Sequence, residues 1–187
     1  MLEPSARLDD GSLPDEVVFS RHQIRDRVSQ LAAAIDRAYA GQFPVIIGVQ
    51  PGAQALLDEL LAQLMLTFTL DSIAVSRYPP APAGRPTVRL VRDLQVDVQA
   101  RPVLLVMDVF DTGLTYHFLC QSLIPRFPAS LDLCALLTRP GRRLVDLPVR
   151  FAGFEAPEAH LVGYGLAFDG QFADLPDIRR LALTTSA

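Results

Sequence analysis

The stretch VLLVMDVFDTGLT, residues 103–115, decides how this chain folds. Its first five residues, Val103–Met107, are all apolar, which is typical of a strand buried on both faces of a parallel sheet. Two carboxylates, Asp108 and Asp111, follow, and the run Thr112–Thr115 then leads into a helix-like segment. A strand that ends in acids, hydroxyls and glycine before a helix suits a phosphorylated ligand. The helix N-terminus offers unpaired N–H groups, and the glycine lets the backbone approach closely.

Segments with the patterns of strands and helices alternate along the rest of the chain. The sequence predicts strands at 44–49, 71–78, 130–137, 151–154 and 161–164, a short hairpin from 88–91 and 94–98, and helices at 24–39 and 53–65. Ser20 and Gln23 fit a capping box at the start of the first helix. Residues 1–15 are predicted to form a loose tail and the Pro-rich run 79–86 a loop. This alternation predicts one α/β domain over residues 1–187, with a mainly parallel, twisted central sheet covered on both faces. Ligands bind such sheets at the carboxyl ends of the strands.

Composition narrows the class of protein. The chain has 187 residues, of which 50% are hydrophobic, and a net charge of -4, so an electrostatic nucleic-acid surface is not expected. It contains no lysine and no asparagine, so its basic side chains are all arginine or histidine. Cys120 and Cys134 lie in apolar runs and are predicted to be buried, reduced thiols. The sequence shows neither a signal peptide nor an apolar run long enough for a membrane, and we expect a soluble cytoplasmic protein.

The stretch at 103–115 resembles the phosphoribosyl pyrophosphate (PRPP) motif of type I phosphoribosyltransferases. In that motif an apolar strand leads to two acids, two apolar residues, Asp-Thr-Gly, any residue, and Thr or Ser. Met107 departs from it by replacing the first acid, and Phe110 is bulkier than the usual aliphatic residue. One alternative is that Asp111 only caps the helix while Thr112 and Gly113 make an ordinary turn. An aspartic protease dyad is disfavoured, because that motif does not open a helix directly after a buried strand.

A longer similarity extends this resemblance. The segment 136–176, which includes GFEAP at 153–157 and VGYGL at 162–166, resembles the C-terminal half of hypoxanthine-guanine phosphoribosyltransferases, and similarity covers about 16–181. The resemblance implies a type I phosphoribosyltransferase-like fold with a small C-terminal hood. It also implies transfer of phosphoribosyl from PRPP to hypoxanthine or guanine, giving the nucleoside monophosphate and pyrophosphate. Magnesium dependence and a homodimer or homotetramer are implied as well, with small molecules as the substrates.

The resemblance also implies roles for individual residues. Asp111 matches the catalytic carboxylate beside the purine N7, a general base or hydrogen-bond acceptor, and Asp108 matches the carboxylate near the ribose, where it could also bind metal. The resemblance implies that the 5′-phosphate is bound by Asp108, Asp111, Thr112, Gly113, Leu114 and Thr115. It implies that the purine is bound by Arg139, His160 and Leu161, and the pyrophosphate by Gln50 and Gly52. Tyr78 is implied to belong to a lid. Each of several residues also has a simpler interpretation: Arg139 as a surface residue in a Pro-Gly turn, His160 as an exposed loop histidine, Arg142 and Arg143 as a solvated pair, and Tyr78 as a strand-end aromatic.

Several positions depart from the family pattern. Gln50 replaces a lysine of the pyrophosphate loop, and Ala167 and Ala173 replace the metal-binding Asp and the pyrophosphate-binding Arg. Asp169 could take over from Ala167 if that segment were extended, because residues two apart then share a side. Together with the replacement of an acid by Met107, these substitutions all concern the leaving group and its metal. Turnover is therefore in doubt. A second hypothesis is therefore a relative that binds a purine nucleotide or PRPP without catalysis, as a sensor or partner subunit.

Overall fold

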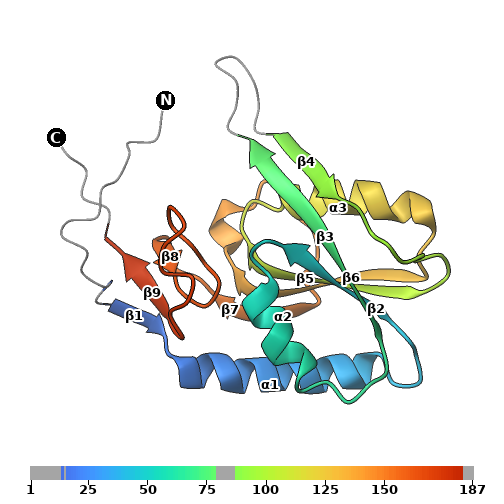
Figure 1. The fold of residues 1–187 in the computed structure, drawn as a ribbon, viewed down its shortest axis with the longest axis horizontal. Helices are drawn as coiled ribbons and strands as arrows, with labels where there is room; N and C mark the ends of the chain where they lie inside the picture. Colours follow the sequence, from blue (N-terminus) through green and yellow to red (C-terminus); the bar gives the residue numbers. More distant parts are fainter. Residues whose placement is uncertain (1–13, 15, 79–86, 183–187) are drawn as a thin grey trace.

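The computed structural model describes Pro14, residues 16–78 and residues 87–182. Within this part of the chain the main sheet has six strands in the order β4-β3-β2-β5-β6-β7 (Figure 1). The strands are β2 (Val45–Gln50), β3 (Thr69–Tyr78), β4 (Thr87–Arg92), β5 (Pro102–Phe110), β6 (Ser130–Thr138) and β7 (Phe151–Glu155). Neighbouring strands are parallel except for the antiparallel pair β3 and β4. The predicted mainly parallel α/β sheet is therefore confirmed.

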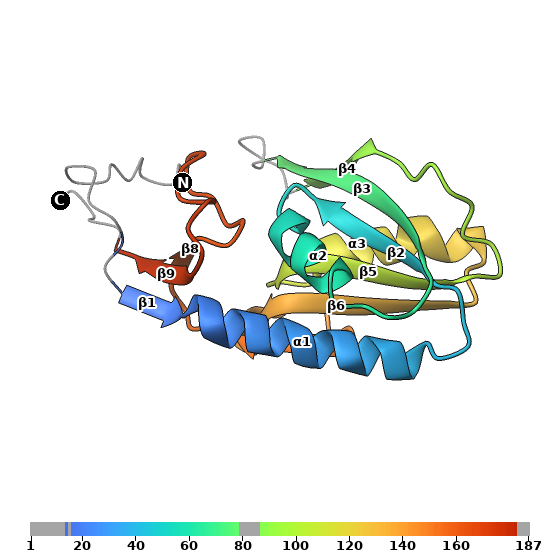
Figure 2. The same ribbon diagram turned by 60° about the horizontal axis from the view of Figure 1, so that its bottom comes forward.

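Helices cover both faces of this sheet. Figure 2 shows α1 (Arg21–Ala38) and α3 (Leu114–Leu123) on opposite sides of β5 and β6, and α2 (Gln54–Leu61) packs on the same face as α1. Successive β5 residues alternate between the two cores, so Leu104 packs with α1 and Leu105 with α3, both without exposed surface. Burial on both faces explains why the strand sequence is continuously apolar rather than alternating.

Helix α1 begins as the sequence predicts. The Ser20 hydroxyl accepts a hydrogen bond from the Gln23 N–H, and the Gln23 side chain accepts one from the Ser20 N–H, which completes the capping box. Helix α2 is shorter than the predicted 53–65 and ends at Leu61. The Asp36 carboxylate of α1 accepts hydrogen bonds from the N–H groups of Met65 and Leu66, and this contact with the segment after α2 directs the chain away from the helical path.

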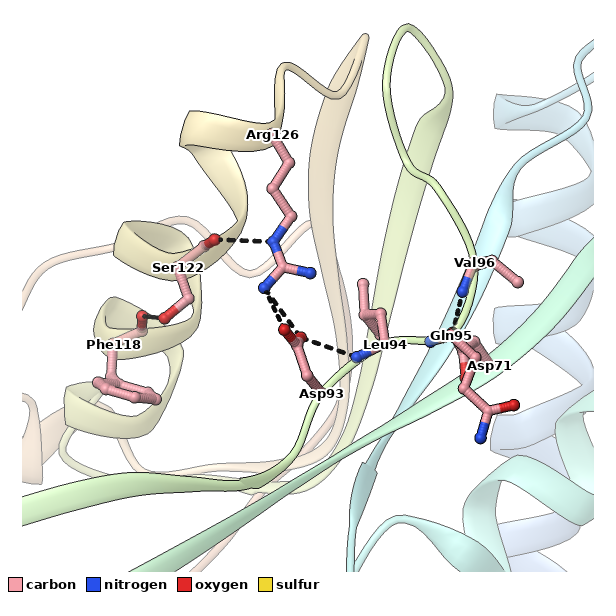
Figure 3. A network of polar contacts seen from close by, with 8 residues as sticks. All are labelled: Asp71, Asp93, Leu94, Gln95, Val96, Phe118, Ser122 and Arg126. Atoms are coloured by element: carbon pink, nitrogen blue, oxygen red, sulfur yellow. Dashed lines mark hydrogen bonds and ion pairs between the residues drawn. The ribbon is translucent and has the colours of Figure 1, made fainter.

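The predicted hairpin between 88–91 and 94–98 is wrong. Strand β4 pairs with β3 instead, and 94–98 is irregular. The reason is visible in Figure 3: the Asp71 carboxylate accepts hydrogen bonds from the N–H groups of Gln95 and Val96, at 2.8 and 3.0 Å. A side chain thus satisfies the backbone donors that a second strand would have used.

A second polar contact holds the start of this irregular segment. Asp93 accepts two hydrogen bonds of 2.8 Å from the guanidinium of Arg126, which follows α3 in the short 3-10 helix η1 (Ile124–Arg126) (Figure 3). Arg126 also donates to the Ser122 carbonyl. Arg126 holds the pKa of the Asp93 carboxyl below its usual value, so this ion pair persists at neutral pH.

A small three-stranded sheet forms the hood. Its order is β1-β9-β8, with β1 (Glu16–Phe19), β9 (Ile178–Leu181) and β8 (His160–Val162) all antiparallel. The hood lies beside the carboxyl ends of the main strands (Figure 1). Two of its strands, β8 and β9, come from the C-terminal part of the chain as predicted, and β1 joins them from the N-terminal part. The Phe19 ring stacks on Phe154 of β7 at 4.4 Å between centroids, which ties the hood to the main sheet.

The two cysteines are free thiols. Cys134 is completely buried, and burial raises the pKa of its thiol to about 12. Cys120 is half-buried, and burial raises its pKa as well. Both therefore stay protonated near neutral pH, as expected for structural cysteines. In the part of the chain that the structure describes, no helix has the length and apolar character needed to cross a membrane.

Three expectations fall on residues outside this description. The predicted tail at 1–15, apart from Pro14, and the Pro-rich loop at 79–86 lie outside the described residues. The backbone of Tyr78 ends β3, and its side chain, the proposed part of a lid, also lies outside them. These expectations stay predictions.

Candidate active site

A cleft of about 690 Å³ opens between the main sheet and the hood. Its walls are the carboxyl ends of β2, β3 and β5, the start of α3, and the hood loop after β8, which is the location expected for ligands of parallel sheets. The cleft brings together five of the predicted site residues: Gln50, Gly52, Asp108, Thr115 and Leu161. Ala167 and Ala173 also line it, together with Met107.

A turn between β5 and α3 continues the site at Thr115. A second cavity of about 10 Å³ is lined by Asp111, Thr112, Gly113 and Thr115, so Thr115 belongs to both hollows. The larger cleft and this turn therefore form one continuous region. Leu114 lines neither cavity; it is the first residue of α3.

The turn exposes unused backbone donors. Among the described residues, no backbone carbonyl accepts a hydrogen bond from the N–H groups of Thr112, Gly113 or Thr115. The helical hydrogen bonds of α3 begin after them, with the His117 N–H donating to the Gly113 carbonyl at 2.8 Å. Unpaired N–H groups at a helix N-terminus, with the positive end of the helix dipole, attract an anion such as a phosphate. Thr115 is 7% exposed, so its hydroxyl lies deep in this turn.

The capping alternative for Asp111 does not hold. The residue in the N-cap position of α3 is Gly113, in the left-handed region at φ +83°, and no side chain caps the helix. The Thr112 hydroxyl accepts a long hydrogen bond of 3.4 Å from the Leu114 N–H. The Asp111 carboxylate therefore does not serve as a helix cap.

The segment 139–145, which we call the clasp, fixes this turn from outside. The Arg139 N–H donates to the Phe110 carbonyl at 3.0 Å, and the N–H groups of Leu144 and Val145 donate to the Thr112 carbonyl at 3.0 and 3.3 Å. The clasp includes the short 3-10 helix η2 (Pro140–Arg142). Contact is close, since a Cβ on Gly113 would lie 2.9 Å from the Val145 carbonyl oxygen. Only glycine fits this position on both steric and conformational grounds.

Asp111 faces a residue that sequence reasoning had placed in solvent. The Arg142 Nε atom lies 3.3 Å from Asp111 Oδ1, and the Asp111 side chain is only 20% exposed. Arg143 also leaves solvent in part, with its guanidinium 5.2 Å from the centre of the Phe110 ring. The expectation of a solvated Arg142–Arg143 pair is therefore met only in part, since Arg142 is 49% exposed but both arginines also make these contacts. The sequence contained no signal for these contacts, because they depend on how the clasp lies across the turn.

Asp108 occupies the floor of the cleft beside the loop after β2. A Cβ on Gly52 would lie 1.8 Å from Asp108 Oδ2, so the carboxylate and the loop backbone touch only because residue 52 is glycine. Asp108 Oδ1 accepts a hydrogen bond from the Val109 N–H at 2.7 Å. Gln50 donates from its side-chain amide to Gln54 at 2.9 Å, which directs it along α2.

The predicted purine-binding residues lie at the end of β6 and the start of β8. Arg139 donates to the Ala159 carbonyl at 2.7 Å, just before His160, while its Nε is buried and has no hydrogen-bond partner among the described residues. His160 is exposed and meets Phe168 edge to face at 6.5 Å. Leu161 lines the cleft, whereas Arg139 and His160 lie outside its lining.

Asp169 lies away from the cleft. It is exposed, has φ +48°, and sits in a tight turn whose ends, Phe168 and Gln171, exchange backbone hydrogen bonds. The condition under which Asp169 could take over from Ala167, an extended segment, is therefore not met. Ala167 itself lines the cleft, and Asp169 does not.

Two contacts hold the hood loop against α2 and so shape the cleft. The Tyr164 hydroxyl donates to the Glu59 carboxylate at 2.6 Å, and burial followed by this hydrogen bond raises the Tyr164 pKa, which keeps the phenol a donor. A Cβ on Gly165 would lie 3.2 Å from both the Ala55 Cβ and the Gly52 carbonyl oxygen. Tyr164 and Glu59 were not singled out from sequence, since each is ordinary in its own segment.

The chain is similar to known phosphoribosyltransferases in both sequence and structure. Residues 18–169 match the phosphoribosyl transferase domain family. The chain is 32% identical over 164 residues to hypoxanthine-guanine phosphoribosyltransferase of Bacillus subtilis, covering 88% of this chain and 91% of that protein. It is 31% identical to hypoxanthine phosphoribosyltransferase of Escherichia coli, covering 90% and 96%. The crystal structure of a hypoxanthine-guanine phosphoribosyltransferase from Bacillus anthracis superposes with a TM-score of 0.84 at 31% identity, covering 91% of this chain and 100% of that one.

The matched residues 18–169 include the six strands of the main sheet and β8 of the hood, and they contain the motif at the end of β5. The aspartic protease interpretation of Asp-Thr-Gly is excluded, because that tripeptide lies here in the turn between a parallel strand and a helix. The chain belongs to the hypoxanthine-guanine phosphoribosyltransferase family.

Proposed function

We propose that this chain is a purine salvage enzyme that transfers the phosphoribosyl group of PRPP to hypoxanthine or guanine. The products are the nucleoside monophosphate and pyrophosphate. The observation that carries the proposal is the set of unpaired N–H groups of Thr112, Gly113 and Thr115, at the border of a cleft of about 690 Å³. A phosphate on this turn would leave the ribose and base to extend into the cleft.

Asp111 has the properties of the catalytic acid–base group. As the purine nitrogen bonds to C1 of the ribose and the bond from C1 to pyrophosphate breaks, the base must lose a proton. A carboxylate within reach of the purine can accept that proton or the corresponding hydrogen bond. Asp111 is largely buried, and the clasp fixes the residues on both sides of it. Asp108, on the cleft floor, would oppose the positive charge that develops on the ribose.

Arg139, His160 and Leu161 are proposed to recognise the base. Arg139 retains a buried, unpaired Nε donor, which suits an acceptor such as the purine 6-oxo group. His160 presents an exposed imidazole that can stack on a base, and Leu161 contributes apolar wall. Gln50 and Gly52 are proposed to border the pyrophosphate, and Tyr78 to belong to a lid.

Magnesium fits this site as an ion bound mainly by the substrate. Mg²⁺ keeps several waters and is usually held by one or two carboxylates together with substrate phosphates. Asp108 offers one carboxylate in the cleft. Among the described residues no group of three or more His, Cys, Asp or Glu could hold a metal. When bound, the ion would offset the negative charge that develops on pyrophosphate.

The alternative function is binding of a purine nucleotide without turnover, as a sensor or partner subunit. It is favoured by the neutral side chains of Ala167 and Ala173 in the cleft wall, and by Gln50, whose amide is engaged with Gln54. We also propose that the protein acts in the cytoplasm as a homodimer or homotetramer. The exposed side chains of Phe43 and Phe127 could contribute to such contacts.

A single assay tests the proposed function. The purified chain is incubated with PRPP, Mg²⁺ and hypoxanthine, guanine or xanthine, and nucleoside monophosphate and pyrophosphate are quantified. We expect product with hypoxanthine or guanine, and loss of product when Mg²⁺ is chelated. Nucleotide binding by calorimetry without product would support the alternative instead. If neither product nor binding were observed, both functions would be wrong.

A further inference from the structure

The contact between Arg142 and Asp111 has an unusual arrangement for an ion pair. Asp111 Oδ1 is buried and makes no hydrogen bond within the described residues, although Arg142 Nε lies 3.3 Å away. The side chain as a whole is 20% exposed, so its exposed surface belongs to its other atoms. Arg142 thus interacts with one carboxylate oxygen as a nearby positive charge, without a hydrogen bond. The other carboxylate oxygen stays open to a ligand.

The backbone holds Arg142 in this place from both sides of Asp111. One end of the clasp is bonded to residue 110, through the Arg139 N–H, and the other end to residue 112, through Leu144. The Arg142 N–H donates in turn to the Arg139 carbonyl at 3.1 Å. Arg142 therefore lies in the middle of a bridge whose two supports flank Asp111, and its contact does not depend on a flexible surface loop.

A comparison within the chain shows what an incidental pair looks like. Arg180 Nε lies 3.3 Å from Glu16 Oε2 in the hood, with the two side chains 46% and 58% exposed. Arg142 is 49% exposed, almost the same, but its partner is largely buried. Solvated pairs contribute little because water screens them, whereas an ionised carboxylate removed from water needs a compensating charge.

We propose that Arg142 is a positioning residue for Asp111. It keeps the buried oxygen of the carboxylate compensated and turned inward, so that the second oxygen is presented to the purine. The inference rests on the proposed function, since it is the role of Asp111 in base binding and proton transfer that gives Arg142 its effect.

The test is a double-mutant cycle. Arg142→Gln, Arg142→Lys, Asp111→Asn and the Arg142→Gln/Asp111→Asn double variant are assayed for kcat and for the KM of hypoxanthine and PRPP. The Kd of inosine 5′-monophosphate is measured by calorimetry on the same proteins. Arg180→Gln is the matched control, because it removes a half-exposed arginine from an ion pair of the same length.

We expect Arg142→Gln to lower kcat/KM for hypoxanthine about tenfold, which corresponds to the loss of about 1.4 kcal/mol, with the KM for PRPP within twofold. Arg142→Lys should recover part of the loss, since it restores the charge without the planar guanidinium. In the Asp111→Asn background the Arg142 substitution should change kcat/KM, and the Kd for the nucleotide, less than twofold. Arg180→Gln should behave as the wild type.

Three results would overturn the proposal: full activity of Arg142→Gln, an equal loss with and without Asp111, or an equal loss in Arg180→Gln. A shift of the melting temperature beyond about 4 °C in Arg142→Gln, with no coupling to Asp111, would make the role structural. If the wild type bound nucleotide without turnover, the cycle would be decided on Kd. If the wild type neither bound nor reacted, the proposed function would fail first, and this inference with it.

Discussion

Replacing Asp111 with alanine or asparagine should lower kcat by about 10²–10⁴-fold, the range that a general acid–base group contributes. The loss is expected because Asp111 is the carboxylate of the turn that no backbone group uses as a helix cap, and its protected position fixes its orientation. Binding of the phosphate should survive, since the N–H groups at 112–115 belong to the backbone. The measurement is steady-state turnover together with calorimetry of inosine 5′-monophosphate, whose Kd should change by less than about fivefold.

Asp132→Asn is the matched control for this prediction. Asp132 is 18% exposed and pairs with Arg150 at 2.6 Å, so it resembles Asp111 in burial and charge, but it lies near the start of β6, opposite Leu104 of β5. The Tyr39 hydroxyl also donates to it. The substitution should lower stability while leaving kcat per folded molecule within twofold. An Asp111 variant that kept more than a tenth of the wild-type kcat would show that this carboxylate is not the catalytic group.

Gly113→Ala should weaken the binding of inosine 5′-monophosphate by about 100-fold, or about 2.7 kcal/mol. The residue has φ +83°, and the added Cβ would lie 2.9 Å from the Val145 carbonyl oxygen and 3.3 Å from the Phe110 ring. The backbone must therefore shift, and the unpaired N–H groups around it shift too. Calorimetry gives the affinity directly, and turnover should fall in parallel.

Gly41→Ala is the control that separates the loss of nucleotide affinity from the general cost of placing alanine in the left-handed backbone region. Gly41 has φ +75° at the end of α1, and a Cβ there would meet nothing within 4 Å. It should lose about 1 kcal/mol of unfolding free energy, measured by urea denaturation, through backbone conformation alone. Its nucleotide affinity should stay within twofold of the wild type. Equal affinity of Gly113→Ala and wild type would mean that this turn does not hold the phosphate.

Much of the fold could be predicted because it is encoded locally. The apolar run 103–107 marks a strand buried on both faces, and Ser20 and Gln23 mark the start of α1. The errors lie where distant contacts decide the backbone. Asp71 replaces a second hairpin strand by binding the N–H groups of 95 and 96, and β1 becomes a strand only by pairing with β9.

The candidate site shows the same division. The strand, turn and helix around Asp111 were predictable, because acid, glycine and hydroxyl positions follow one another in sequence. The contact of Arg142 with Asp111 was not, since it depends on a segment thirty residues away lying across the turn. The turn that carries Asp169 could not be predicted either, because it depends on the backbone pairing of Phe168 with Gln171.

The central claim is that the turn after β5 is a phosphate cradle. The most direct measurement compares the calorimetric Kd of inosine 5′-monophosphate with that of inosine for the wild-type chain. Several N–H groups and a helix N-terminus should make the phosphorylated ligand at least about 100-fold tighter, because inosine lacks the group that they hold. Equal affinities for the two ligands would contradict the account.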